Sequence, residues 1–130
     1  MVKLSNSELA HKAIEYVIDY EKNQGRNAVD VSREGVGYDV KSDNRFIEVK
    51  GKIEGWKSYN WQQLYKSEVD CLKQNTDSFY LYIVRFEENE IDLYIIPGKS
   101  LLDNFKITPE VYRLSPISKR KLAGFIAEST

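Results

Sequence analysis

A chain of 130 residues, of which 42% are hydrophobic, predicts one globular domain with a buried core. Its single cysteine and single histidine exclude an internal disulfide framework and a zinc site built from these residues, and they fit a reducing cytoplasm. The net charge of −1 argues against coating of nucleic acid by bulk charge, and we expect neither a secretory signal nor a membrane span, which needs roughly 20 apolar residues.

The first predicted element is a helix that opens at the capping-box pattern Ser5-Asn6-Ser7-Glu8 and ends near Gln24, before Gly25. Apolar residues recur in it with the i, i+3, i+4 spacing of a helix that packs on a core. These residues are Ala10, Ala13, Ile14, Val17 and Ile18.

Strands follow this helix. A short strand is predicted at Val29–Val31, because a valine lies on each side of Asp30. A β-hairpin comes next, with strands at about Tyr38–Lys41 and Arg45–Lys50. A turn at 42–44 joins them, and the glycine at 51 predicts a loop after the second strand.

The second half of the chain begins with a predicted helix over Trp61–Gln74, with Asn60 as its N-cap. The continuous apolar run Phe79–Val84 is typical of a strand that is buried on both faces. A turn rich in glutamate leads to another strand at Ile91–Ile96.

The remaining residues carry weaker patterns. They suggest a helical turn at 100–105, a short strand at 112–114 and a terminal helix at 118–127. The order of elements predicts an α/β fold with a mixed sheet flanked by helices. We expect one domain, with a core over about 7–98 and a short C-terminal extension over about 99–130.

The hairpin carries a group of charged residues. Because side chains alternate along a strand, Glu48 and Lys50 share one face, and Ile47 and Val49 point to the other. With Asp39 on the preceding strand, two carboxylates and an ammonium form what a divalent metal and an activated water require. Such groups also form weak ion pairs on ordinary protein surfaces, which is the alternative interpretation.

The metal would be a hard, oxygen-liganded ion such as Mg²⁺ or Mn²⁺, because histidine and cysteine are so scarce. The stretch from Lys41 to Lys73 is also rich in basic and aromatic side chains. On composition alone this is a solvated surface, but beside a metal site it would suit phosphate binding and base stacking. The basic residues are Lys41, Arg45, Lys50, Lys52, Lys57, Lys66 and Lys73.

The acid on one strand followed by Glu48-Val49-Lys50 on the next resembles the PD-(D/E)xK nuclease superfamily, which has the restriction-endonuclease-like fold with an αβββαβ core. More closely, Gly37-Tyr38-Asp39-Val40 with Phe46-Ile47-Glu48-Val49-Lys50 is similar to the core of the NO VEIN C-terminal-like (DUF3883) family. The likeness covers roughly residues 10–98. It also takes in the segments 13–21, 31–32, 66–68, 80–84 and 93–98.

The resemblance implies a metal-dependent nuclease that hydrolyses phosphodiester bonds, and we expect DNA as the substrate. Asp39 and Glu48 would ligate Mg²⁺ or Mn²⁺, with the Val49 carbonyl as a further ligand. Lys50 would position or help deprotonate the attacking water and oppose the negative charge that develops on the phosphate.

Members of the superfamily often add an acid from the first helix. Glu15 matches that acid better by its position and is the predicted catalytic residue, although it could equally be an ordinary exposed residue. Glu21 is the rival. It falls on the apolar stripe, where a carboxylate needs a cation or a metal as partner, and we expect it to have a structural role or to lie beside the metal ligands.

The second helix supplies further candidates. Glu68 lies on its inward face and could either contribute a polar group to the site or form a salt bridge with Lys50 or Lys66. Gln62 and Tyr65 could contact substrate, although large aromatic residues are more often part of a core.

A second function is a catalytically inactive module of the same fold that binds nucleic acid or a partner protein. The near-neutral charge and small size favour it, whereas the complete set of two acids and a lysine counts against it. The small surface available to grip a duplex favours a homodimer.

Overall fold

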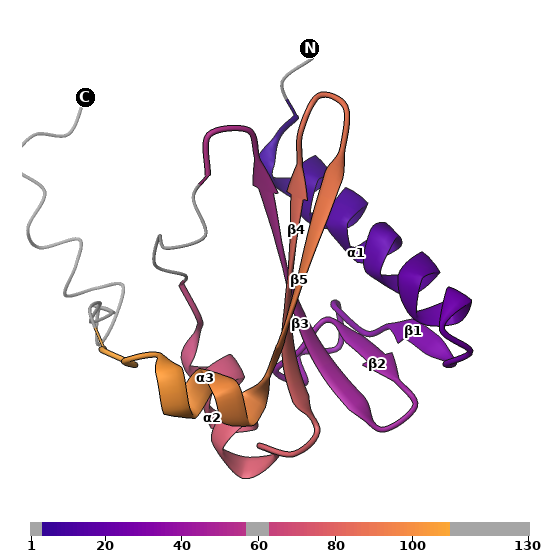
Figure 1. The fold of residues 1–130 in the computed structure, drawn as a ribbon. Helices are drawn as coiled ribbons and strands as arrows, with labels where there is room; N and C mark the ends of the chain where they lie inside the picture. The colour runs from indigo at the N-terminus through magenta and orange to yellow at the C-terminus, as the bar shows by residue number, and fades with distance from the viewer. Residues whose placement is uncertain (1–3, 57–62, 110–130) are drawn as a thin grey trace, which may run out of the picture.

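The structure, a computed structural model, describes residues 4–56 and 63–109 (Figure 1). The described residues form a five-stranded sheet of order β1-β2-β3-β4-β5. Helix α1 lies on one side of the sheet, and α2 and α3 lie on the other (Figure 1). This mixed α/β architecture, with its αβββαβ order, confirms the predicted fold class. In chain order the elements are α1 (Asn6–Asn23), β1 (Ala28–Asp30), β2 (Val40–Ser42), β3 (Arg45–Ile53), α2 (Lys66–Gln74), β4 (Phe79–Phe86), β5 (Ile91–Pro97) and α3 (Gly98–Asn104).

Strands β3 and β4 are parallel, and the other neighbouring strands are antiparallel. A parallel pair needs a crossover connection, and the segment containing α2 provides it. On the side of the sheet that carries α2 and α3, called the α2 side below, the strand register aligns three rows of residues across β3, β4 and β5. The rows are Glu48–Leu81–Ile96, Lys50–Ile83–Tyr94 and Lys52–Arg85–Asp92.

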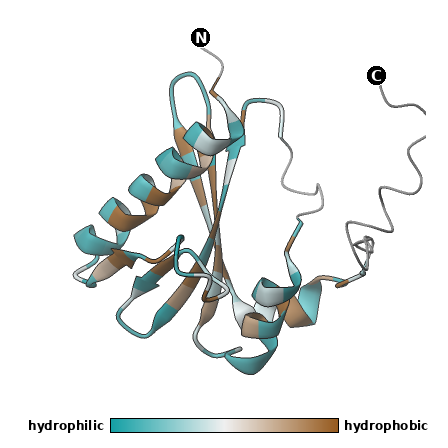
Figure 2. Cartoon of the chain, turned by 180° about the vertical axis from the view of Figure 1, so that it is seen from behind, coloured by the Kyte–Doolittle hydropathy of each residue, from teal (hydrophilic) through white to brown (hydrophobic). Residues whose placement is uncertain are grey.

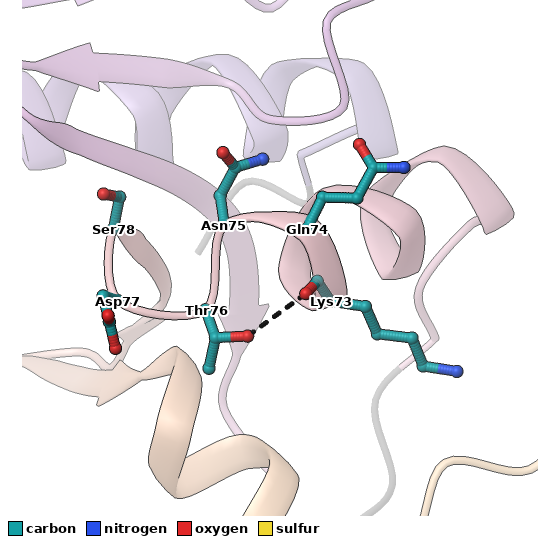
Figure 3. A pocket seen from close by; sticks show the side chains of 6 residues that line it. All are labelled: Lys73, Gln74, Asn75, Thr76, Asp77 and Ser78. Atoms are coloured by element: carbon teal, nitrogen blue, oxygen red, sulfur yellow. Dashed lines mark hydrogen bonds between the residues drawn. The ribbon is translucent and has the colours of Figure 1, made fainter.

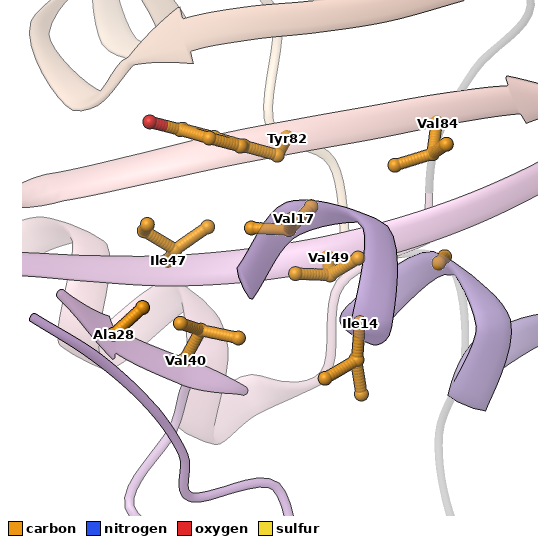
Figure 4. Packing of buried hydrophobic residues seen from close by; sticks show 9 residues of the cluster. Ile14, Val17, Ala28, Val40, Ile47, Val49, Tyr82 and Val84 are labelled. Carbon is orange, nitrogen blue, oxygen red and sulfur yellow. The ribbon is translucent and has the colours of Figure 1, made fainter. Parts of the chain in front are cut away.

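The α1 side of the sheet is covered by an apolar cluster. Hydrophobic and hydrophilic residues alternate along α1 (Figure 2), as expected of a helix with one buried face. Its buried residues meet Ile47 and Val49 of β3 and Tyr82 and Val84 of β4 (Figure 4). The buried members are Ala13, Ile14, Val17, Ala28, Val40, Ile47, Val49, Tyr82 and Val84.

The α2 side is covered by apolar residues at the end of the sheet where β4 begins. The buried members of this second cluster are Cys71 and Leu72 of α2, Phe79, Leu81 and Ile83 of β4, and Leu101 of α3. In Figure 1 both helices lie beside this lower end of the sheet. Of the three rows, only Lys52–Arg85–Asp92, nearest the carboxyl ends of β3 and β4, is polar throughout, whereas Glu48 and Lys50 of β3 lie beside apolar residues of β4.

Strand β3 is longer than predicted, because Gly51 continues it instead of ending it. Helix α1 passes close to the strand here: a Cβ on Gly51 would lie 3.0 Å from the Leu9 carbonyl oxygen and 3.1 Å from the Ala13 Cβ. The glycine thus permits close packing of helix on strand and does not mark a loop.

Helix α2 begins at Lys66, so the prediction that 63–65 are helical is wrong. Tyr65 is the N-cap, with extended backbone, and the Glu68 carboxylate accepts a hydrogen bond from its backbone N–H at 3.1 Å. This local bond starts the helix later than the apolar pattern suggested. The predicted N-cap at Asn60 and the residue Trp61 lie outside the described residues.

The other boundaries differ by one or two residues from those predicted. β1 begins at Ala28, β2 begins at Val40, and α3 begins at Gly98. The predicted strand at 112–114 and helix at 118–127 lie outside the described residues. No helix of the described ranges is long and apolar enough to cross a membrane.

Candidate active site

Glu48 and Lys50 lie together on the α2 side of β3. Alternation along the strand turns Ile47 and Val49 into the opposite, apolar cluster, as the sequence predicted. Glu48 is only 2% exposed, and the Lys50 Nζ atom lies 3.3 Å from its Oε2 atom. Lys50 is closer to the surface, with 20% of its side chain exposed. The ion pair therefore has a buried acid and a more accessible base.

Asp39 is the residue directly before β2, and its carboxylate lies beside this pair. The paired register of β2 with β3 ends at Val40 and Ile47, and the Asp39 N–H donates to the Ile47 carbonyl at 2.9 Å, which leaves the Asp39 carboxylate beside that of Glu48. Its Oδ2 atom accepts a hydrogen bond from the Val49 N–H at 2.9 Å. The N–H and C=O groups of one strand residue point to the same side, so the Val49 carbonyl also faces the side where Asp39 lies.

Glu68 adds a third carboxylate from the first turn of α2. Its Oε1 atom lies 3.5 Å from the Lys50 Nζ atom and also accepts the Tyr65 N–H. The structure thus forms the salt bridge with Lys50, while Lys66 pairs with Asp70. Glu68 connects the start of α2 to the charged residues of β3.

The neighbouring charged groups shift the pKa values of Glu48 and Lys50. Burial raises the pKa of Glu48, and the neighbouring Asp39 and Glu68 carboxylates raise it further, against the opposing effect of Lys50. Burial alone would lower the pKa of Lys50, but Glu48 and Glu68 outweigh it and raise that pKa. The cluster is defined by Asp39, Glu48, Lys50 and Glu68, and is called the carboxylate cluster below.

The carboxylate cluster fits a divalent cation. Three carboxylates face one ammonium, so the cluster has two more negative than positive charges when all are ionised, and a divalent cation would balance them. Within residues 4–56 and 63–109, no three Asp, Glu, His or Cys side chains form a metal site on their own. Mg²⁺ often takes only one or two carboxylates and keeps several waters, so Asp39, Glu48 and the Val49 carbonyl are a suitable set of ligands.

An exposed aromatic ring lies beside the cluster. Tyr65 is 66% exposed, and the Lys50 Nζ atom lies 5.9 Å from the centre of its ring. An exposed aromatic ring next to a cation is the kind of surface on which nucleic-acid bases stack. Gln62, the other predicted substrate contact, lies outside the described residues.

The structure does not bring Glu15 to the cluster, which corrects its predicted catalytic role. Glu15 lies on α1, which covers the opposite side of the sheet, and 62% of its side chain is exposed. Its Oε1 atom lies 2.9 Å from the Nε2 atom of His11, one turn away. The position of an acid along a helix does not reveal which side of the sheet that helix will cover.

Glu21 also lies away from the cluster, on the α1 side. It is fully buried and accepts two 2.7 Å hydrogen bonds from Arg26 and one of 3.0 Å from the Tyr82 hydroxyl. Arg45 donates to the same hydroxyl at 2.7 Å. Glu21 thus has the cationic partner that a buried acid needs, and its role is structural.

Lys52 is a cation on this side of β3 that the sequence did not single out. Because the predicted strand ends at Lys50, Lys52 counts in the sequence only as one of the basic residues between Lys41 and Lys73. The alternation of Glu48, Lys50 and Lys52 was the signal that could have identified it, because residues two apart on a strand share a face.

A hollow of about 410 Å³ lies elsewhere, at the turn between α2 and β4 (Figure 3). One continuous segment, residues 73–78, lines it, and it contains no member of the carboxylate cluster. The Thr76 hydroxyl donates to the backbone carbonyls of Leu72 and Lys73. These bonds end the helix locally and do not create a binding site.

Comparison with known proteins gives one match. The family model described as "Protein NO VEIN, C-terminal" matches residues 10–96, from α1 through β5. The match spans more than half of the chain, so the chain belongs to this family. No curated protein and no solved structure matches it significantly.

Proposed function

We propose that this member of the NO VEIN C-terminal family is a nuclease that uses Mg²⁺ or Mn²⁺ to hydrolyse phosphodiester bonds of DNA. The observation that carries the proposal is the carboxylate cluster: a buried Glu48, with the Asp39 carboxylate beside it and Lys50 in contact, at a mixed sheet. The order of acid, then E-x-K, on an αβββαβ core resembles that of PD-(D/E)xK nucleases and supports the same function.

Each residue has a chemical role in this proposal. Asp39 is fixed by the hydrogen bond from the Val49 N–H, which leaves its other oxygen for the cation. A bound Mg²⁺ would make a coordinated water more acidic and neutralise charge on the phosphate. Lys50, held by Glu48 and Glu68, can orient the attacking water and oppose the charge that develops on the phosphate oxygens.

Substrate binding would use the exposed side of the cluster. Tyr65 presents its ring beside Lys50, where it can stack on a base next to the scissile phosphate. Because stacking is tolerant of sequence, this contact favours a nuclease that recognises the nucleic-acid strand more than its base sequence.

The test is cleavage of plasmid and oligonucleotide DNA with Mg²⁺ or Mn²⁺. We expect Asp39→Asn and Lys50→Ala to lower the rate at least a hundredfold, on the order of the loss that follows removal of one charge-stabilising group. Glu15→Gln is the matched control, because this exposed acid lies on the opposite side of the sheet and should leave the rate as in the wild type. Full activity in both site variants would refute the proposal.

The second candidate is a catalytically inactive module that binds nucleic acid or a partner protein. The observation that favours it is that no three Asp, Glu, His or Cys side chains within the described ranges form a metal site on their own. Isothermal titration with Mn²⁺ separates the candidates. Binding of Mn²⁺ that disappears in Asp39→Asn favours the nuclease, whereas oligonucleotide binding without metal binding or cleavage favours the module.

A further inference from the structure

Beyond Lys50, the α2 side of β3 continues with Lys52. The two lysines are two residues apart on one strand, so their Cα atoms are roughly 7 Å apart and their side chains leave the sheet in the same direction. Across the sheet, Lys52 is aligned with Arg85 of β4 and Asp92 of β5. Lys52 therefore extends the basic side of the carboxylate cluster toward the carboxyl ends of the parallel strands.

The neighbouring cations have acidic partners. Lys50 contacts Glu48 and Glu68. The guanidinium of Arg85 contacts Asp92 and Glu87 and also donates to the Trp56 carbonyl at 3.2 Å. These carboxylates are thus already paired.

Lys52 makes no salt bridge within the described residues, although its side chain is only partly exposed. Burial lowers its pKa, and the nearby charge of Lys50 lowers it further. A cation placed beside another cation, with no carboxylate at salt-bridge distance among the described residues, destabilises the free protein. A lysine that served only packing would extend its ammonium away from Lys50 into water.

We propose that Lys52 binds the phosphate next to the one that is cleaved. This inference rests on the proposed nuclease function. With the scissile phosphate at Asp39, Glu48 and Lys50, the spacing along β3 resembles the separation of adjacent phosphates in an extended strand. The substrate is then a polynucleotide whose backbone follows β3, and not a single nucleotide.

The experiment measures binding of a short fluorescein-labelled single-stranded DNA to the full chain, with Ca²⁺ in place of Mg²⁺ and the DNA verified to be intact afterwards. We expect Lys52→Gln to weaken binding about tenfold, as loss of one charged hydrogen bond does. The slope of log affinity against log salt concentration should fall by about 0.7, the value for one phosphate contact on a single strand. Lys22→Gln, on the exposed surface of α1, carries the same charge change and should alter neither quantity.

A second measurement separates phosphate binding from a structural role. In urea unfolding without DNA, Lys52→Gln should be at least as stable as the wild type, because the variant removes repulsion from Lys50. A marked loss of stability would assign Lys52 to packing and overturn the inference.

The two proposals can fail separately. Unchanged DNA affinity and salt slope in Lys52→Gln, or no DNA binding by the wild type, would overturn the role of Lys52 even if the enzyme cleaves DNA. Conversely, a wild-type protein that binds DNA through Lys52 but never cleaves it retains this inference and loses the nuclease function.

Discussion

A carboxylate buried as deeply as Glu48 normally has a cation or several hydrogen-bond donors around it. Its neighbours include one ammonium, that of Lys50, and two further carboxylates. Such a site stabilises the fold poorly, whereas Glu21 has a full set of partners in Arg26 and Tyr82. The difference between these two buried acids supports the proposed functional role of Glu48, because strongly perturbed ionisable groups cluster at functional sites.

The partners of Glu21 lead to a prediction about stability and pH. Burial acts to raise the pKa of Glu21, but hydrogen bonds from Arg26 and Tyr82 outweigh it, so the folded-state pKa lies below the ordinary 4.5. The stabilisation is therefore fully present above pH 4.5 and is lost as the pH falls through the folded-state pKa. We expect Glu21→Gln to lower the free energy of unfolding by about 2–3 kcal/mol at neutral pH.

Urea unfolding of the wild type and Glu21→Gln, measured at neutral pH and at pH values below 4.5, checks the prediction. The difference between the two proteins should shrink in acid, since the wild-type carboxylate then becomes neutral as well. Glu15→Gln, which removes an exposed acid of the same helix, should change stability little at either pH. A difference that is constant with pH would contradict the assigned ion pair.

At the scale of elements, the hairpin was predictable because its alternation is simple. Strand periodicity places Glu48 and Lys50 on one side of the sheet, as predicted. It does not determine the position of Asp39, because Tyr38 packs on the α2 side and Val40 on the α1 side, so alternation is interrupted at Asp39.

The position of Glu15 could not be predicted from the sequence, because it depends on which side of the sheet α1 covers. The start of α2 was missed because one hydrogen bond, from Tyr65 to Glu68, fixes it.

Gly37 leads to a prediction about how α2 docks against the sheet. It has φ +89°, and a Cβ there would lie 2.8 Å from the Ser67 carbonyl oxygen and 3.2 Å from the Cys71 Cβ. Alanine at this position must push α2 away, so we expect Gly37→Ala to cost about 3 kcal/mol in the free energy of unfolding, since overpacking adds to backbone strain. The same movement would separate Glu68 from Lys50.

Gly35 offers the matched control for this measurement by urea unfolding. It also has positive φ, +65°, but a Cβ there would meet open space. Gly35→Ala should therefore cost only the backbone strain, about 1 kcal/mol. If both variants lose the same stability, the close approach of α2 to Gly37 does not constrain the fold.

At the scale of the whole molecule, the two sides of the sheet differ in how far apolar residues cover them. The α1 side is covered by an apolar cluster and by the hydrogen bonds of Glu21, so it contributes stability. The α2 side is apolar along β4 as far as Ile83 and becomes polar at the row of Lys52, Arg85 and Asp92. Ligands of α/β proteins commonly bind at the carboxyl ends of parallel strands, and the carboxylate cluster lies at this transition.

If the proposed metal site is correct, the stability of the whole protein depends on divalent cations. A cation that binds at the carboxylate cluster of the folded state only would stabilise that state by mass action. At a Mg²⁺ concentration ten times the Kd, the free energy of unfolding should rise by about 1.4 kcal/mol. Thermal unfolding followed by circular dichroism, with and without Mg²⁺, measures this.

Asp39→Asn provides the internal comparison for this effect. It removes a proposed ligand while keeping an acceptor for the Val49 N–H, so the fold should remain and the response to Mg²⁺ should disappear. Without Mg²⁺ the variant should be as stable as the wild type or more so, because one of the crowded carboxylates is gone. An equal response to Mg²⁺ in both proteins would mean that the cation binds elsewhere, and that the charge of the carboxylate cluster is balanced in another way.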